Sequence, residues 1–337
     1  MTLSRRFALT GATSGVGRRF AEMALEAGHR VVGLVRDPDK PEAKELAALG
    51  VALVRGDLSD RAALGELTRG ADAVVHMAAH VGDWGPVEQF VNVNVVGTRN
   101  VLDAARESGV RRFVHLSSTA VYGRPDRGRV DESWPTKHAG VPYDDTKVDA
   151  ERTALAFGED TGMEVAAVRP PIIYGPYDRN FMPRAVENLR KGRFLLIDGG
   201  RAPLNVVWVD HVVDVAILAA THASAPGQAF NVMDEVDLRP PSVVDVATTI
   251  ADAVGAPRPK RSLPYAVAYP LSWAALRAFQ IGGASKPPPF TPFVVKILTR
   301  DVVYDASKAV RLLGWKPRVR ALEGIRREAE AFAARTR

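Results

Sequence analysis

Two residues four positions apart, Tyr143 and Lys147, have types and a spacing that indicate chemistry. If the segment is helical, they share a face, so the Lys147 ammonium lies near the Tyr143 hydroxyl and favours its ionised form. Lowering the pKa of a phenol from about 10 to about 7 takes roughly 4 kcal/mol, which a desolvated ammonium and a cofactor's positive ring together supply. A tyrosine in that state is a general acid or base. The YxxxK pattern also occurs by chance, so a surface helix that begins with a tyrosine is the alternative.

A glycine-rich segment spans residues 10–17, between a short apolar run and a helical pattern over residues 18–27. Glycines in such a segment permit a tight turn, close approach of the backbone to a pyrophosphate and close packing of the helix. The amides and the dipole at the helix N-terminus favour an anion. We therefore expect a dinucleotide phosphate beside Gly11, Thr13, Ser14, Gly15, Val16 and Gly17. A simple strand-to-helix turn is the alternative.

The elements that must position these residues are apolar runs at residues 5–10, 30–36, 51–55, 73–76, 112–116 and 164–169. The runs lack the polar alternation of a half-exposed strand, as burial on both faces predicts. Helical patterns lie between them. This order indicates an α/β fold, a Rossmann doubly wound parallel sheet with helices on both faces and a smaller C-terminal substrate domain. Such sheets bind ligands at the carboxyl ends of their strands.

The domain organisation follows from the same pattern, because no long glycine- or serine-rich linker divides the chain. We expect residues 1–176 to form the NADP-binding domain, with returns to the sheet near residues 205–232. Residues 177–204 and 233–337 are expected to form mainly the substrate-binding domain.

The ends of the second and third predicted strands bear on the choice of cofactor. Arg36 is placed to bind a 2′-phosphate, which favours NADP(H). Asp37, one position later, is placed to accept from ribose hydroxyls, so NAD(H) is the alternative. After the third run, the Asp57 carboxylate is expected to accept from the adenine amino group, with Leu58 beside it. A role for Asp57 in a helix N-terminal turn is the alternative.

The 337-residue chain has a formal net charge of +6 and no cysteine, which excludes disulfides, thiolate metal sites and a cysteine nucleophile. Its basic residues are dispersed except near the C-terminus, where residues 322–334 have helical apolar spacing with charges opposite. No zinc-ligand spacing or groove-reading motif accompanies them, so we expect no metal site and no nucleic-acid partner. A small-molecule substrate and cofactor phosphates suit the positive charge better.

The chain begins with the first apolar run, without a separate apolar segment and cleavage site, so we expect a cytoplasmic location. The most apolar stretch, residues 263–281, is interrupted by Pro264, Pro270 and Arg277 and is not expected to span a membrane. We interpret it as a packed helix of the second domain. Lining of an apolar substrate tunnel and peripheral contact with a membrane surface are the alternatives.

Several motifs occur in order along nearly the whole chain. They are His76-Met77-Ala78-Ala79, Asn94-Val95-Val96-Gly97-Thr98, Ser117-Ser118-Thr119-Ala120-Val121-Tyr122-Gly123, the YxxxK pattern and Arg169-Pro170-Pro171-Ile172-Ile173-Tyr174-Gly175-Pro176. With them, the chain resembles the extended branch of the short-chain dehydrogenase/reductase superfamily, also called the NAD-dependent epimerase/dehydratase superfamily. The glycine loop departs from this branch, because its TGxxxGxG spacing is that of the branch with shorter chains. The other motifs and the chain length favour the extended branch.

The resemblance implies that Ser118, Tyr143 and Lys147 are the catalytic residues and that Asn94 supports their hydrogen-bond network. It also implies a homodimer. The residues that it places beside the cofactor, besides the glycine loop, are Ala78, Ala79, Tyr143, Lys147 and Pro170. Packing or solvation, rather than proton transfer, is assigned to His80, His115 and His138.

Members of the branch that act on nucleotide sugars commonly carry an asparagine shortly before the YGP element, where this chain has Pro171-Ile172-Ile173. The chain therefore resembles 3β-hydroxysteroid dehydrogenase-like and dihydroflavonol reductase-like members more. This resemblance implies interconversion of a ketone and a secondary alcohol on a bulky, largely apolar substrate. The residues expected to line the substrate pocket are Trp84, Thr119, Trp134, Ile173, Tyr177 and Phe181. A nucleotide-sugar epimerase or dehydratase with retained NAD, and a non-catalytic NADP sensor, are the alternatives.

Overall fold

The computed structural model describes residues 4–82, 84–282 and 290–336. Its centre is a seven-stranded sheet in the order β11-β7-β5-β4-β1-β2-β3, and each neighbouring pair is parallel. The strands are β1 (Arg6–Thr10), β2 (Arg30–Val35), β3 (Ala52–Arg55), β4 (Ala73–His76), β5 (Arg112–Leu116), β7 (Glu164–Arg169) and β11 (Ala229–Asn231). The predicted doubly wound parallel sheet is confirmed.

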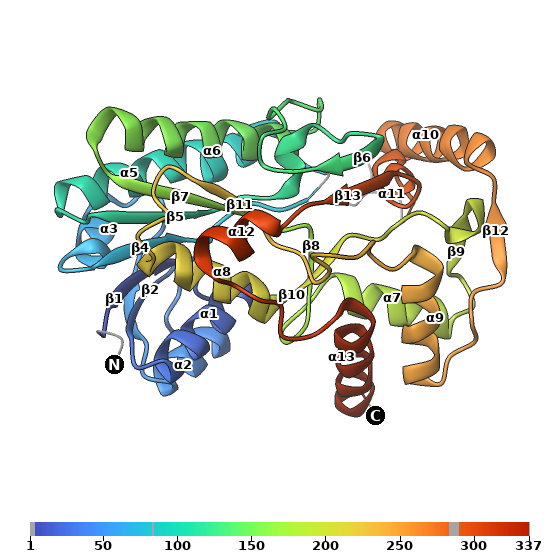
Figure 1. The fold of residues 1–337 in the computed structure, drawn as a ribbon, viewed down its shortest axis with the longest axis horizontal. Coiled ribbons are helices and arrows are strands. Elements are labelled where there is room, and N and C mark those ends of the chain that lie inside the picture. Colours follow the sequence, from blue (N-terminus) through green and yellow to red (C-terminus); the bar gives the residue numbers. More distant parts are fainter. Residues whose placement is uncertain (1–3, 83, 283–289, 337) are drawn as a thin grey trace.

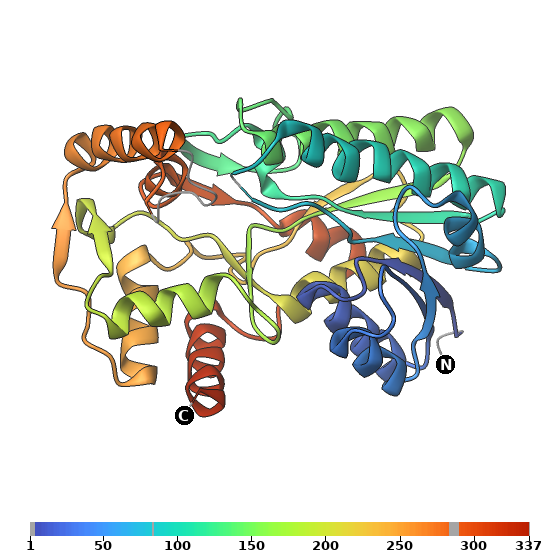
Figure 2. The ribbon, with the colours of Figure 1, turned by 180° about the vertical axis from the view of Figure 1, so that it is seen from behind.

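Helices cover both faces of this sheet, as the buried strands predict (Figures 1 and 2). One layer lies below the sheet in Figure 1 and consists of α1 (Gly15–Glu26), α2 (Pro41–Ala48) and α8 (Val209–Thr221). The opposite layer consists of α3 (Arg61–Thr68), α5 (Gly97–Glu107) and α6 (Pro142–Thr161). Each layer has its own buried core, represented by Phe20 and Val213 on one face and by Leu102 and Phe157 on the other.

The register of the strands aligns their carboxyl ends at one edge of the sheet. Thr10, the last residue of β1, pairs with His76, the last residue of β4, and His76 pairs with His115 of β5. The segments that follow these strands therefore begin side by side. The first is the loop into α1, and another is the single 3-10 turn Thr119–Tyr122 after β5.

A second lobe, at the right of Figure 1, is formed mainly by later parts of the chain. Its core joins side chains of α7 (Phe181–Arg190), α9 (Val243–Val254) and α13 (Ala321–Arg335), such as Val186, Ile250 and Ile325. The elements of this lobe and of its junction with the sheet are β8 (Ile172–Tyr174), α7 (Phe181–Arg190), β9 (Leu195–Ile197), the 3-10 turn Asp198–Gly200, β10 (Val206–Trp208), α9 (Val243–Val254), β12 (Arg261–Leu263), α10 (Tyr265–Ile281), α11 (Pro292–Ile297), β13 (Asp301–Tyr304), α12 (Ser307–Leu313) and α13 (Ala321–Arg335).

One predicted return of the chain to the sheet is wrong. β11 joins the central sheet beside β7, but β10 pairs with β8 in a separate two-stranded sheet. The reason lies in Pro170 and Pro171, which follow β7 directly and lack the N–H groups that a central strand needs. The chain leaves the sheet there, and the β8–β10 pair packs against the core of the second lobe instead. β6 (Arg127–Val130) likewise pairs with β13 outside the central sheet.

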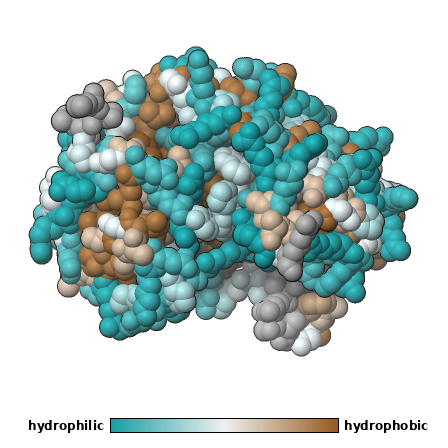
Figure 3. Space-filling model, turned by 90° about the horizontal axis from the view of Figure 1, so that it is seen from below, coloured by the Kyte–Doolittle hydropathy of each residue, from teal (hydrophilic) through white to brown (hydrophobic). Residues whose placement is uncertain are grey.

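The apolar stretch at residues 263–281 contains α10, which packs on α11 around Ile197, Ala268 and Val295. Its other face is open to solvent, since Leu271 is 56% exposed and Trp273 is 42% exposed. Within the described ranges, no helix is long and apolar enough to cross a membrane. The face of the molecule seen in Figure 3 is mostly hydrophilic and is interrupted by separate apolar patches.

Candidate active site

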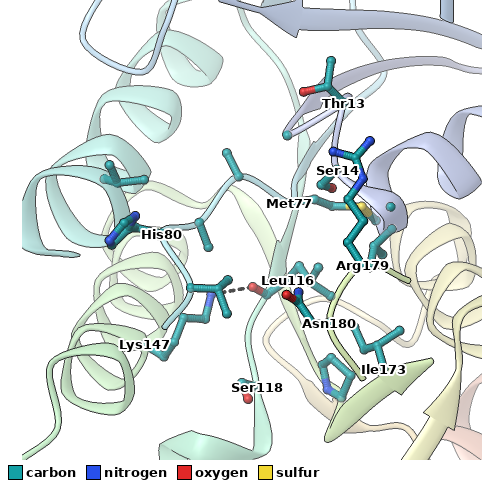
Figure 4. Close-up of a pocket in the computed structure, with 18 of the residues that line it drawn as sticks. Thr13, Ser14, Met77, His80, Leu116, Ser118, Lys147, Ile173, Arg179 and Asn180 are labelled. Carbon is teal, nitrogen blue, oxygen red and sulfur yellow. Dashed lines mark hydrogen bonds between the residues drawn. The ribbon is translucent and has the colours of Figure 1, made fainter. Parts of the chain in front are cut away.

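A cavity of about 1100 Å³ follows the carboxyl ends of the central strands, and part of its lining is shown in Figure 4. The predicted site residues that line it are Gly11, Thr13, Ser14, Gly15, Val16, Arg36, Asp57, Leu58, Ala78, Ala79, Ser118, Tyr143, Lys147, Pro170, Ile173, Tyr177 and Phe181. The predicted site residues outside its lining are Gly17, Trp84, Asn94, Thr119 and Trp134. The glycine loop and the Ser-Tyr-Lys residues, more than 100 positions apart in sequence, thus face one space.

The glycine loop has little room for side chains. Gly11 has a φ of +69°, and a Cβ on it would lie 2.7 Å from the backbone nitrogen of Ala78. A Cβ on Gly17 would lie 2.2 Å from the carbonyl oxygen of Gly11. Gly17 therefore lets α1 pack against the loop, although it does not itself line the cavity. The Ser14 hydroxyl begins the helix by accepting from the Gly17 amide at 3.0 Å.

These features fit a dinucleotide. The backbone of the loop is bare at the N-terminus of α1, where amides and the helix dipole favour phosphate. Arg36, which follows β2, and Asp57 and Leu58, which follow β3, line the same cavity. The Asp57 carboxylate accepts from the amide and hydroxyl of Ser59 at 2.7 and 2.6 Å, and these bonds hold its pKa below its usual range. The local turn that the sequence left as an alternative for Asp57 is therefore present.

Tyr143 and Ser118 are hydrogen-bonded to each other in the lining of the cavity. Tyr143 lies in the first turn of α6, which begins with Pro142, and Ser118 precedes the 3-10 turn after β5. Burial raises the pKa of Tyr143 to about 12, the Asp144 carboxylate adds to this, and the hydrogen bond with Ser118 opposes it. The expected lowering by the neighbouring lysine is not found. The physical reason is that desolvation of the phenol dominates, and the Lys147 ammonium is directed elsewhere.

The Lys147 ammonium is anchored to β5 rather than to Tyr143. Its Nζ donates to the carbonyl oxygen of Leu116 at 2.6 Å, drawn as the dashed line in Figure 4, and lies 3.4 Å from Nε2 of His115. The side chain is 2% exposed, and this burial lowers its pKa to about 8, although Glu151 acts in the opposite direction. Lys147 is thus a desolvated cation held beside the strand end.

Two buried histidines lie behind this lysine. His76 and His115 stack with ring centroids 5.6 Å apart. Nδ1 of His76 is 2.7 Å from the Thr10 hydroxyl and its Nε2 is 3.0 Å from that of Thr98. Burial, and secondarily the Lys147 ammonium, lowers the pKa of His76 to about 3 and the pKa of His115 well below its usual value. Both rings are therefore neutral near pH 7.

The expected role of His115 was packing, and its contact with Lys147 was not predicted. The only signal in the sequence is that His115 directly precedes Leu116, whose carbonyl oxygen accepts from the Lys147 ammonium. Only the packing of α6 against β5 converts that neighbourhood into a contact.

Asn94 lies behind the cavity in a π-helical segment, Val91–Val96, that joins α4 (Val87–Phe90) to α5. Its side-chain oxygen accepts from the amide of His80 at 2.7 Å. Its nitrogen donates to the His80 carbonyl at 3.1 Å and to the Thr146 hydroxyl at 3.0 Å. Asn94 therefore links the segment after β4 to the helix that carries Tyr143 and Lys147. π-helical segments are frequent at functional sites.

Three of the six predicted substrate residues line the cavity, and three do not. Ile173 and Phe181 line the cavity, and Figure 4 shows Ile173 below Arg179. Tyr177 lies at the glycine-loop end, since its hydroxyl donates to Glu22 of α1 at 2.6 Å and the Arg18 guanidinium stacks 4.1 Å from its ring.

The other three substrate candidates lie away from the lining. The hydroxyl of Thr119 is hydrogen-bonded to that of Tyr304, and Thr119 is buried. Trp134 is 39% exposed, and Trp84 is partly buried. The cavity is also lined by Arg179 and Asn180, which were not among the predicted site residues.

Comparison with known proteins gives the family. Residues 7–232 match the NAD dependent epimerase/dehydratase family. A 2-alkyl-3-oxoalkanoate reductase of Stenotrophomonas maltophilia (strain K279a) is 31% identical over 334 residues, which cover 97% of this chain and 99% of the relative. A 3 beta-hydroxysteroid dehydrogenase/Delta 5→4-isomerase of Mycobacterium tuberculosis (strain CDC 1551 / Oshkosh) is 31% identical over 329 residues, which cover 93% of this chain and 86% of the relative.

The fold is shared with solved structures as well. The crystal structure of gox2253 superposes with a TM-score of 0.80 at 26% identity and covers 99% of both chains. The matched residues include the glycine loop, the strand before Ser118 and the helix of Tyr143 and Lys147. The chain therefore belongs to the NAD-dependent epimerase/dehydratase family, within the extended short-chain dehydrogenases/reductases.

Proposed function

We propose that this protein is an NADP(H)-dependent oxidoreductase that interconverts a ketone and a secondary alcohol on a bulky, largely apolar substrate. The observation that carries the proposal is that Ser118, Tyr143 and Lys147 line the same cavity as the glycine loop. Groups able to transfer a proton and groups able to hold a dinucleotide phosphate therefore face one space.

In the reductive direction, Tyr143 gives its hydroxyl proton to the substrate oxygen as a general acid. NADPH, when bound, supplies the hydride that reduces the carbonyl carbon. The pKa near 12 keeps the phenol protonated at neutral pH, which is the form that reduction requires. The Ser118 hydroxyl, which is hydrogen-bonded to Tyr143, orients the substrate oxygen. Solvent replaces the proton of Tyr143 after each turnover.

Lys147 has a positioning role in this proposal. An ammonium has three N–H donors. One donates to the carbonyl of Leu116 and a second faces Nε2 of His115. We assign the remaining donor to the ribose hydroxyls of the cofactor, because Lys147 lines the cavity beside Tyr143.

The cofactor and substrate classes rest on separate observations. Arg36 lines the cavity at the end of β2, where a cation favours the 2′-phosphate of NADP(H). The apolar side chains of Ile173 and Phe181 and the names of the two relatives, an oxoalkanoate reductase and a hydroxysteroid dehydrogenase, support an apolar ketone or alcohol. A homodimer and a cytoplasmic location stay predictions.

The second candidate is an epimerase or dehydratase of nucleotide sugars that retains NAD, and the family description favours it as an alternative. It predicts NAD that stays bound through purification. A non-catalytic NADP sensor is less well supported, because sensing alone has no need of the Ser-Tyr-Lys residues.

The experiment is NADPH oxidation, followed by absorbance, against ketosteroids, β-keto acids and esters, flavonoid ketones and 4-keto nucleotide sugars, with NADH in parallel. We expect turnover of a bulky apolar ketone with NADPH preferred. Tyr143→Phe is expected to lower kcat by about 10²–10⁴ and to leave NADPH binding nearly unchanged. Activity confined to nucleotide sugars, or an equally active Tyr143→Phe variant, would contradict the proposal.

A further inference from the structure

Arg179 is a cation of the cavity lining that has no role in the chemistry above. It lies in the loop between β8 and α7 and lines the same cavity as Arg36 and the glycine loop. In Figure 4 its side chain extends toward Thr13 and Ser14. The second lobe thus presents a guanidinium to the loop where we place the cofactor.

The backbone that carries Arg179 is held on both sides. Before it, Tyr177 has a φ of +68° and is bonded to Glu22 of α1 at 2.6 Å. After it, the Asp178 carboxylate accepts from the amides of Asn180, Phe181 and Met182 at 2.7, 3.0 and 2.7 Å. The side chain, by contrast, is 63% exposed. Its base is therefore fixed while its guanidinium is able to change partner.

The present partner of Arg179 is Glu42, in the first turn of α2. Nη2 of Arg179 lies 3.3 Å from Oε1 of Glu42. Helix α2 begins five residues after Arg36, and Arg36 and Arg179 line the same cavity. An exposed single-contact ion pair adds little stability and is easily exchanged.

The other charges facing this position are largely engaged. Arg18 pairs with Glu22 and with Glu45 and stacks on Tyr177. Lys40, at the start of α2, lies near Glu42 and adds positive charge. Glu42 is thus the carboxylate that the Arg179 guanidinium must leave to bind a phosphate.

We propose that Arg179 exchanges Glu42 for the 2′-phosphate of NADP(H), which it binds together with Arg36, and that Glu42 competes with that phosphate. The inference rests on the proposed NADP(H) preference and deepens it, by assigning part of the preference to a residue of the second lobe. A phosphate monoester accepts a guanidinium fork that a ribose hydroxyl does not match. Arg179 is therefore a specificity-determining residue contributed by the segment between β8 and α7.

The test is calorimetric binding of 2′,5′-ADP, ADP and 5′-AMP to the full chain, without substrate or turnover. We expect Arg179→Gln to weaken the binding of 2′,5′-ADP by about tenfold or more and to leave the binding of ADP nearly unchanged. Glu42→Gln is expected to strengthen the binding of 2′,5′-ADP and to leave the binding of ADP unchanged. The control is Arg190→Gln, an exposed arginine at the end of α7, which is expected to alter neither.

Three outcomes overturn the inference in distinguishable ways. If Arg179→Gln weakens the binding of 2′,5′-ADP and of ADP equally, Arg179 binds the pyrophosphate and not the 2′-phosphate. Unchanged binding of both ligands, with wild-type protein preferring 2′,5′-ADP, removes Arg179 and leaves the NADP(H) preference standing. Wild-type protein that does not distinguish 2′,5′-ADP from 5′-AMP removes the preference itself and Arg179 with it, while the reductase assay remains an independent measure of the proposed function.

Discussion

The Lys147 ammonium donates to the carbonyl oxygen of Leu116, 2.6 Å away, and this bond ties helix α6 to the end of strand β5. Ser118 lies two residues after Leu116 and Tyr143 lies one helical turn before Lys147. The bond therefore ties together the two elements that carry the Ser118 and Tyr143 hydroxyls. It also explains why the ammonium is directed at the strand rather than at Tyr143.

We expect turnover to fall as the pH rises through about 8. Burial lowers the pKa of Lys147 to about 8, so the ammonium is present below this pH and is lost above it. Loss of the charge weakens the bond to Leu116 and, in the proposed function, the bond to the cofactor ribose. The measurement is the pH profile of kcat between pH 6 and 10. Lys147→Arg, whose guanidinium stays charged, is expected to abolish the fall near pH 8 at a lower overall rate, and a flat wild-type profile would contradict the prediction.

Asn94 and Thr146 are expected to act as one unit. Asn94 is 2% exposed, and its side chain bonds the backbone of His80 and the hydroxyl of Thr146. Replacement by alanine removes these hydrogen bonds and leaves their partners unsatisfied. We expect Asn94→Ala to lower the free energy of unfolding by about 1–3 kcal/mol and to lower kcat by shifting α6. Denaturant unfolding of Asn94→Ala, Thr146→Val and the double variant checks this. Strictly additive effects would show that the contact carries no coupling.

Gly17→Ala is expected to lower both stability and cofactor binding. Its Cβ would lie 2.2 Å from the carbonyl oxygen of Gly11, so the helix start or the loop must shift. We expect a loss of about 1–3 kcal/mol in unfolding free energy and weaker NADPH binding. Gly65→Ala in α3 is the matched control, because no atom lies within 4 Å of the added Cβ. That variant is expected to be stabilised by about 0.5–1 kcal/mol; an equal loss in both would contradict the steric argument.

We expect the stability of the fold to depend strongly on the ion pair between Glu151 of α6 and Arg169 of β7. Their side chains are 1% and 5% exposed, and Nε of Arg169 donates to Glu151 at 2.9 Å. Glu151→Ala leaves a buried guanidinium without its carboxylate, so we expect a loss of about 3–5 kcal/mol in unfolding free energy.

A pair in which only the arginine is exposed provides the control for that variant. Arg111, whose side chain is 82% exposed, pairs with Glu164, and Arg111→Ala is expected to change stability by about 0–1 kcal/mol. Thermal or denaturant unfolding of the two variants measures the difference. A Glu151→Ala variant as stable as Arg111→Ala would contradict the role assigned to burial.

Much of the site follows from residues near one another in sequence. The glycine loop was predicted because Gly11 and Gly17 stand between an apolar run and a helical pattern, and a tight strand-to-helix turn is a local property. The buried strands were predicted because their residues lack alternation. Tyr143 and Lys147 were paired because helical periodicity places residues four apart on one face. Arg179 was not predicted, because a lone arginine in a loop has no local pattern that marks it.

The sequence by itself determined the parallel sheet and the glycine turn into α1, because periodic burial and turn-forming residues are local properties of neighbouring residues. Only the tertiary structure decided that β10 pairs with β8, that burial raises the pKa of Tyr143, and that Arg179 reaches Glu42, 137 positions away. Such contacts and desolvation depend on how segments distant in sequence pack together, and no local pattern specifies that packing.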